Sequence, residues 1–99
     1  MRPVTVEHDA VQQRFAATLA DGSVAELRYH RAGTILDFYH TFVPEAFRTE
    51  GVAEQVVLAG FQYARQAGYR VIPSCPYVSR GFLRRHPEFA DLVDGRGGQ

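Results

Sequence analysis

The chain has 99 residues, which allows one small domain with enough apolar content for a single core. Its 11 basic and 11 acidic residues give a formal net charge of zero and are spread through the sequence, which argues against a broad basic surface for nucleic acid. Neither a secretory signal nor an apolar stretch near the roughly 20 residues of a membrane span is recognisable, so we expect a cytoplasmic protein without membrane contact.

The first half of the sequence predicts an antiparallel meander of three or four strands. Its segments either alternate apolar with polar side chains or are rich in β-branched and aromatic residues. Asp21-Gly22 is a strong hairpin turn signal, residues 31–33 supply the next turn, and Pro44 ends the series. The expected strands lie around Val4 and Val6 and over residues 15–19, 24–29 and 34–43.

The second half predicts a helix, a strand and a second helix. Apolar residues recur at helical spacing after residue 51, and Gly68 is a usual C-terminal stop, so the first helix is expected from about residue 51 to 68. Residues 69–73 form a short apolar strand, and a second helix is expected over 76–85. The prediction is one domain over 1–93 and a flexible tail over 94–99.

This order of elements predicts an α+β fold. The strands before and after the first helix are expected to be parallel neighbours joined by a right-handed crossover. Two such strands can splay, and a ligand chain can then lie between them while its charged end rests on the N-terminus of the intervening helix. The sequence therefore places a candidate site between the ends of the strands at 34–43 and 69–73.

The most informative stretch is the start of the first helix, Arg48-Thr49-Glu50-Gly51-Val52-Ala53. Backbone N–H groups at this point have no partner inside the helix, and the helix dipole adds positive charge, so the loop is suited to bind an anion. Gly51 permits close approach of the backbone to a ligand, and Arg48 can add a charge-assisted hydrogen bond to phosphate. The same pattern also fits an ordinary amphipathic helix with a polar start.

Three side chains near this site could take part in chemistry. Cys75 is the only cysteine, so it forms neither an internal disulfide nor a metal cluster; a thiol that precedes a helix can be reactive, or it can be a core residue. Tyr77 could donate a proton to a leaving thiolate or simply pack, and His40 could accept a proton from an amine or be structural. Phe42 and Val43 would act through backbone amide groups left free at a splayed strand.

Residues 48–53 fit the pyrophosphate-binding pattern of the GNAT superfamily of N-acetyltransferases, which is Arg or Gln, two residues, Gly, one residue, then Gly or Ala. From Gly33 to Val93 the chain resembles small single-domain GNAT-like proteins with a compact GNAT-like fold. Thr49 departs from the pattern, because many relatives have a second Gly there. The other segments that carry the resemblance are 40–44, 71–78 and 86–92.

The resemblance implies an N-acetyltransferase with acetyl-CoA as cosubstrate and no metal. The pyrophosphate would lie on residues 48–53, the pantetheine arm beside Phe42 and Val43, and Cys75 would be the thiol suspected to act in this family. The N-terminal helical pair that shapes the acceptor pocket of full-length GNAT enzymes is missing. The acceptor is therefore an unidentified small amine or peptide, and the pocket could be open or completed in a homodimer.

Two routes of acetyl transfer fit these residues. In direct transfer, a base such as His40, or water, deprotonates the amine, and Cys75 or Tyr77 protonates the sulfur of CoA as it leaves. In the covalent route, Cys75 takes the acetyl group first and passes it on. We favour direct transfer, because no sequence-adjacent base activates Cys75.

Two other classes of function are alternatives. The protein could bind acetyl-CoA or CoA as a sensor or partner module with little or no catalysis, since a fold does not guarantee an activity. A thiol-dependent redox protein is disfavoured, because the sequence has no second cysteine.

Overall fold

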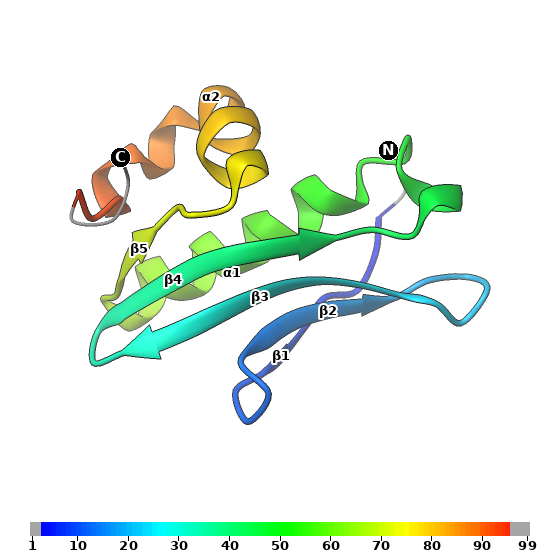
Figure 1. The fold of residues 1–99 in the computed structure, drawn as a ribbon, viewed down its shortest axis with the longest axis horizontal. Coiled ribbons are helices and arrows are strands. Elements are labelled where there is room, and N and C mark those ends of the chain that lie inside the picture. The colour runs from blue at the N-terminus through cyan, green and yellow to red at the C-terminus, as the bar shows by residue number, and fades with distance from the viewer. Residues whose placement is uncertain (1–2, 96–99) are drawn as a thin grey trace.

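A computed structural model describes residues 3–95 as a five-stranded sheet with helical segments packed against it (Figure 1). The strands follow one another across the sheet in chain order, and the first four are antiparallel. The predicted α+β fold and its meander are therefore confirmed. The strands are β1 Glu7–Asp9, β2 Arg14–Thr18, β3 Val24–Ala32, β4 Ile35–Phe42 and β5 Arg70–Ile72, and the helical segments are η1 Glu45–Phe47, α1 Val52–Ala67, η2 Tyr77–Phe82, α2 Leu83–Arg85 and η3 Pro87–Leu92.

The turns explain where the predicted strand limits are right and where they are wrong. Gly22 has a left-handed φ of 87° in the β2–β3 hairpin, as the Asp21-Gly22 signal predicted. The next turn lies at Gly33, with φ 62°, so β3 continues through Ala32 instead of ending at Tyr29. The first strand is also later than predicted, since β1 pairs with β2 through residues 7–9 and not around Val4 and Val6.

A β-bulge interrupts the pairing of β4 with β3. Tyr29 is opposite Phe38, whereas Arg28 is opposite His40, so Tyr39 is an extra residue in β4. Residues directly opposite each other in an antiparallel pair share a face of the sheet. Since Leu27 and Tyr29 are buried beneath α1, Arg28 and His40 lie on the other face.

The parallel strands β4 and β5 pair over a short distance and then separate. Their register joins Ile35 to Arg70, and it ends where Asp37 meets Ile72. The N–H of Cys75 still donates to the carbonyl of Phe38 at 2.9 Å, after which the chain continues into η2. This arrangement confirms the predicted parallel neighbours, and α1 is the crossover between them (Figure 1).

Helix α1 packs closely on the sheet through Gly60. A Cβ atom at this position would lie 2.8 Å from Cδ2 of Leu27 and 3.0 Å from Cζ of Phe38, and both of these side chains are fully buried. Glycine therefore lets the middle of α1 approach β3 and β4 more closely than any other residue would allow. At the end of the helix, Gly68 has φ 76°, and its N–H binds carbonyls of the last turn as predicted.

The second helical region contains both α-helical and π-helical turns. The predicted helix over 76–85 is present, but η2 is π-helical and α2 follows directly. Its aromatic residues complete the core: the Phe82 ring stacks on Phe61 of α1, with centroids 5.3 Å apart and planes within 4°. Phe89 of η3 packs on the same Phe61 ring at 5.3 Å.

The packed part of the chain includes the first residue of the predicted tail. Asp94 is only 8 % exposed, and its N–H donates to the carbonyl of Val71 at 2.7 Å. Packing thus reaches Asp94, and the division into a domain over 1–93 and a flexible tail over 94–99 stays a prediction. The remainder of the predicted tail includes residues 96–99, which lie outside the described part of the chain.

A charged contact connects the end of α2 to the first turn of α1. Nε2 of His86 lies 2.6 Å from Oε2 of Glu54, Nδ1 lies 3.1 Å from Oε2 of Glu88, and the ring stacks on Phe82 at 4.3 Å. The hydrogen bond to Glu54 raises the pKa of His86 above its usual value, although partial burial opposes the rise. The protonated imidazole therefore stabilises the docking of this region on α1.

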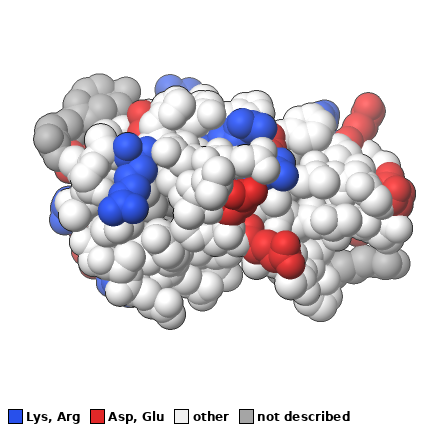
Figure 2. All heavy atoms as spheres, turned by 90° about the horizontal axis from the view of Figure 1, so that it is seen from below, with Lys and Arg blue, Asp and Glu red and all other residues white. Residues whose placement is uncertain are grey.

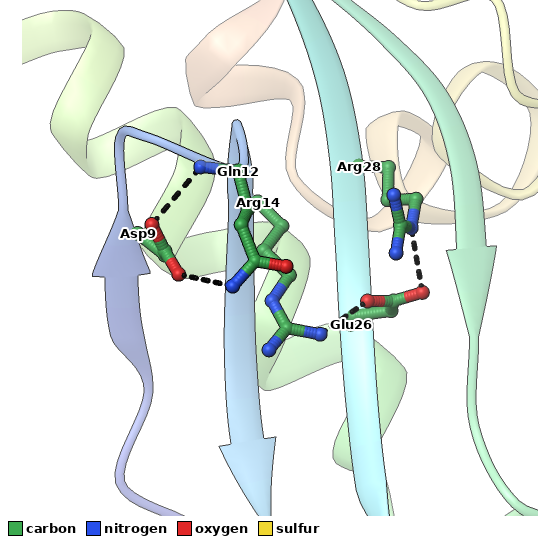
Figure 3. Close-up of polar contacts among 5 residues, drawn as sticks. All are labelled: Asp9, Gln12, Arg14, Glu26 and Arg28. Carbon is green, nitrogen blue, oxygen red and sulfur yellow. Dashed lines mark hydrogen bonds and ion pairs between the residues drawn. The ribbon is translucent and has the colours of Figure 1, made fainter.

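The sheet face opposite α1 is polar, and on it one carboxylate, Glu26, pairs with two arginines. Glu26 accepts hydrogen bonds from Nη1 of Arg14 at 3.0 Å and from Nε of Arg28 at 2.8 Å (Figure 3). Burial alone would raise the pKa of Glu26, but the hydrogen bonds from the two arginines outweigh burial and lower the pKa.

On another side of the molecule, Figure 2 shows basic and acidic groups scattered over a largely uncharged surface. Within residues 3–95, no helix is long and apolar enough to cross a membrane.

Gly60→Ala should destabilise the fold. The added methyl group would overpack the contact with Leu27 and Phe38 at a cost of about 1–3 kcal/mol, which exceeds the helix-propensity gain of about 1 kcal/mol. Chemical denaturation measures the change in the free energy of unfolding. Leu27→Val should cost less in the Gly60→Ala background than in the wild type; equal costs in the two backgrounds would contradict the proposed contact.

His86→Gln should reduce stability mainly at acidic pH. A folded-state pKa raised above 6.5 stabilises fully below that pH, and the contribution is lost as pH rises through the folded-state value. We expect a loss of about 1 kcal/mol or less near pH 6, after allowance for solvent screening, and a smaller loss near pH 9. His8 also titrates, and partial burial lowers its pKa, so its contribution to stability changes with pH in the opposite direction to that of His86. This contribution is present in both proteins and cancels when the free energy of unfolding of the variant is subtracted from that of the wild type.

Urea denaturation at several pH values gives this difference. The same substitution made in a Glu54→Gln background should show much less pH dependence, because the main cause of the raised pKa is then removed. A pH-independent loss in the wild-type background would show that His86 contributes by packing on Phe82 alone.

Candidate functional site

A cavity of about 410 Å³ opens at the N-terminus of α1. Its walls come from the loop between η1 and α1, from the first turn of α1, and from both ends of the second helical region. The whole predicted anion loop is thus part of one concave site together with Tyr77. The lining residues are Arg48, Thr49, Glu50, Gly51, Val52, Ala53, Glu54, Tyr77 and Arg85.

Gly51 directs the chain into α1 so that the first-turn amides face outward from the helix end. It has a left-handed φ of 74°, a conformation that glycine adopts without strain, and its carbonyl accepts the N–H of Gln55 at 3.3 Å. No side chain of the described residues caps this N-terminus with a hydrogen bond. Amide N–H groups of the first turn and the positive end of a 16-residue helix are therefore directed towards the cavity.

Arg48 is held in place by the backbone of β4's C-terminal extension. Its Nε donates to the carbonyl of Val43 at 3.0 Å, and among residues 3–95 no carboxylate forms an ion pair with it. The Val43 carbonyl therefore already accepts one hydrogen bond, from Arg48, and the role of the Phe42 and Val43 backbone toward a ligand stays a prediction. Val43 itself is buried, while the Phe42 side chain is 42 % exposed at the end of β4. The terminal nitrogens of Arg48 remain available to an anion in the cavity.

Cys75 lies at the junction of the two separating strands and the second helical region. Its N–H binds Phe38, and its carbonyl accepts the N–H groups of Val78 at 2.9 Å and Ser79 at 3.1 Å. The thiol is 7 % exposed, and its Sγ lies 3.5 Å from Oγ1 of Thr41. Cys75 is thus part of the packed core, and Thr41 is the hydrogen-bonding partner that the described part of the chain gives its thiol; a catalytic role for Cys75 stays a prediction.

Tyr77 connects the region of Cys75 to the anion loop. It lies in the first turn of η2, lines the cavity, and its ring is close to the backbone of Gly81, where a Cβ would be 3.2 Å from the ring. Burial raises the pKa of its hydroxyl, so the group keeps its proton at neutral pH. A protonated phenol beside an anion site can donate a hydrogen bond or a proton.

His40 is not brought to this cavity. It lies beyond the Tyr39 bulge, its side chain is exposed, and its partner in the register is Arg28 on the polar face of the sheet. Cys75, by contrast, belongs to the buried core under the helices. A catalytic role for His40 stays a prediction, and it requires an acceptor that approaches from the polar face.

Sequence reasoning missed three residues at this site: Thr41, Glu54 and Arg85. Glu54 is recognisable as an acidic residue in the first turn of a helix, and Arg85 belongs to a basic Arg-Arg-His run at a helix end. Their meeting across the cavity depends on tertiary packing, which no local pattern reveals. Among residues 3–95, no group of three or more His, Cys, Asp or Glu side chains is arranged to hold a metal ion.

Known proteins are similar to this chain in sequence over most of its length. "Protein NATD1" from Bos taurus is 31 % identical over 87 residues, which cover 86 % of this chain and 76 % of the relative. The human protein of the same name is 29 % identical over 87 residues, with 86 % and 76 % covered, and the Danio rerio protein is 29 % identical over 93 residues, with 89 % and 83 % covered.

The fold and the family agree with this similarity. An NMR structure of a GCN5-like protein from Staphylococcus aureus superimposes with a TM-score of 0.70 and 20 % identity, covering 96 % of this chain and 92 % of that chain, which shows a shared fold. The sequence model described as "GCN5-related N-acetyl-transferase" matches residues 14–92, from the second strand to the last helical turn. The chain therefore belongs to the GCN5-related N-acetyltransferase (GNAT) family, as its sequence pattern predicted.

Proposed function

We propose that this protein transfers the acetyl group of acetyl-CoA to the nitrogen of an amine acceptor and releases CoA. The observation that carries the proposal is the uncapped N-terminus of α1, which opens into the cavity behind Gly51 in a chain of the GNAT family. Helix N-termini with free amides are suited to phosphate groups, and CoA contains a diphosphate. Family membership alone leaves cofactor and acceptor undefined, so the geometry of this site is the additional support.

The residues at this site fit a diphosphate in three respects. The glycine at position 51 supplies the left-handed turn that exposes the amides, and the cavity gives room for a ligand of this size. Arg48 adds a guanidinium that is anchored through Nε, so its terminal nitrogens can bind phosphate oxygens with little loss of conformational freedom. The separation of β4 from β5 beyond Phe38 offers a path for the pantetheine arm beside Phe42 and Val43.

Acetyl-CoA supplies an activated thioester, and side chains of the protein would donate the proton that the leaving CoA sulfur accepts. Tyr77 is the better-placed donor, because it lines the cavity and a phenol carries its proton at neutral pH. Cys75 is buried beside Thr41, and a hydroxyl cannot serve as the base that a cysteine nucleophile needs at neutral pH. This arrangement favours direct transfer over an acetyl-cysteine intermediate.

A second candidate function is coenzyme binding with little or no turnover. It is favoured by one specific observation: His40, the predicted base, lies on the polar face of the sheet and not at the cavity. A protein of this kind would bind acetyl-CoA or CoA as a sensor or as a module in a larger assembly. Binding and turnover must therefore be measured separately.

Acetyl-CoA should raise the melting temperature of the wild-type protein, and the substitution pair Gly51→Asn and Gly51→Asp should locate the binding site. At a ligand concentration of 100 times Kd the stabilisation is about 2.7 kcal/mol, which corresponds to a rise in melting temperature of about 10–20 °C for a domain of this size. Asn and Asp have the same shape and both tolerate left-handed φ, but only Asp places a negative charge among the first-turn amides.

We expect Gly51→Asn to keep most of the ligand-induced shift and Gly51→Asp to lose it, with similar melting temperatures for the two unliganded variants. A shift of wild-type size in both variants would show that the diphosphate binds elsewhere, whereas loss of the shift in both would show that any side chain at position 51 blocks the ligand. A wild-type protein that neither shifts with acetyl-CoA nor releases CoA in the presence of polyamines, amino acids or peptides would refute the proposed function.

Tyr77→Phe should slow acetyl transfer while coenzyme affinity is retained. Loss of a general acid typically costs about 10²-fold or more in rate, whereas the phenyl ring keeps the packing against Gly81. CoA release under saturating acetyl-CoA measures kcat, and Tyr69→Phe, in the loop before β5, is the matched control. If both variants turn over like the wild type, Tyr77 is a packing residue.

When the wild-type protein is incubated with acetyl-CoA and no acceptor, mass spectrometry should find Cys75 unmodified; an acetylated Cys75 would establish the covalent route instead.

A further inference from the structure

The cavity at the start of α1 contains a second arginine that the family pattern does not include. Arg85, the last residue of α2, lines the same space as Arg48 although 37 positions separate them in the sequence. The other charged residues that line the cavity are Glu50 and Glu54. The site therefore has one basic group from the β4–α1 connection and one from the second helical region.

Arg85 has a weak partner in this structure. Its Nη1 lies 3.8 Å from Oε1 of Glu54, at the outer limit of an ion pair, and its side chain is 64 % exposed. Oε2 of the same Glu54 is 2.6 Å from His86 Nε2. Because His86 is a closer partner for Glu54, Arg85 can turn away without leaving that carboxylate unpaired. An exposed pair of this geometry is worth little, so its exchange for another anion is inexpensive.

Arg48 and Arg85 differ in how they are held. Arg48 is held by its hydrogen bond to the Val43 carbonyl, whereas Arg85 is an exposed side chain with only a long contact to Glu54. Two guanidinium groups beside helix amides, one anchored and one exposed, suit a ligand with several phosphate oxygens, since Arg binds phosphate through two donors at once. Glu54 alone would repel such a ligand, and His86 reduces that repulsion by pairing with it.

We infer that Arg85 is a second phosphate ligand of the coenzyme, and that it exchanges its contact with Glu54 for the diphosphate when the coenzyme binds. This inference rests on the proposed coenzyme function of the same cavity. The inferred phosphate site then includes a residue from outside the β4–α1 loop. A bound coenzyme would contact both the N-terminus of α1 and the C-terminal end of α2. A change at α2 should therefore alter coenzyme affinity without touching the anion loop.

The test compares Arg85→Gln with Arg84→Gln by isothermal titration with CoA and with 3′-dephospho-CoA, which lacks the separate 3′-phosphate. Arg84 is the matched control, because it is an exposed arginine in the same turn that does not line the cavity. We expect Arg85→Gln to raise Kd about tenfold for both ligands and Arg84→Gln to change it less than about twofold. The difference should shrink as salt concentration rises.

The outcomes separate this inference from the proposed function. If the wild type binds CoA and the two variants bind equally well, Arg85 is not a phosphate ligand, and the coenzyme proposal stands without it. If Arg85→Gln weakens CoA but not 3′-dephospho-CoA, the assignment to the diphosphate is wrong. If the wild type binds neither ligand, the proposed function fails. Circular dichroism and melting temperature check that both variants are folded like the wild type.

Discussion

The separation of β4 from β5 beyond Phe38 is the constraint on which the candidate site depends. Main-chain pairing holds the two strands together over three register positions and ends with the Cys75–Phe38 hydrogen bond. From there β4 leads through η1 to the start of α1, while the other chain segment turns into η2 and carries Tyr77. The cavity lies between the residues that follow these two departures, with Arg48 to Glu54 on one side and Tyr77 and Arg85 on the other.

The position of α1 on the sheet determines whether its amides can face that cavity. Gly60 allows a close approach to Leu27 and Phe38 in the middle of the helix, and Gly51 sets the direction of the chain at its N-terminus. Arg48 is then fixed by the Val43 carbonyl, so the β4–α1 connection has few alternative conformations. The same close packing that stabilises the domain therefore preorganises the site. A ligand would find the amides and one guanidinium already in place, which reduces the ordering cost of binding.

Local signals in the sequence were sufficient for most of the fold and for part of the site. Gly22, Gly51 and Gly68 all have left-handed backbone where the sequence required a turn or a helix end, and the strand–helix–strand order required the parallel pair. The Tyr39 bulge carries no such signal, because it depends on how β4 matches β3, and it decides that His40 lies on the polar face. Arg85 was missed for a similar reason: its position beside the anion loop follows from the stacking of Phe82 on Phe61, a contact between distant parts of the chain.

The two faces of the molecule use arginine in opposite ways, and this contrast argues for the cavity as the functional surface. On the polar face of the sheet, Arg14 and Arg28 both donate hydrogen bonds to the carboxylate of Glu26, and these bonds lower its pKa. The charges of the two arginines are therefore largely neutralised within the protein. At the cavity, the guanidinium of Arg48 donates to a neutral carbonyl and retains its charge for an external anion. A positive group that the fold orients but does not neutralise, beside the positive end of a helix, creates a local potential that attracts phosphate. Glu50 and Glu54 also line the cavity, so the groups that favour phosphate there are Arg48, Arg85 and the helix amides, a local arrangement that a net charge of zero does not reveal.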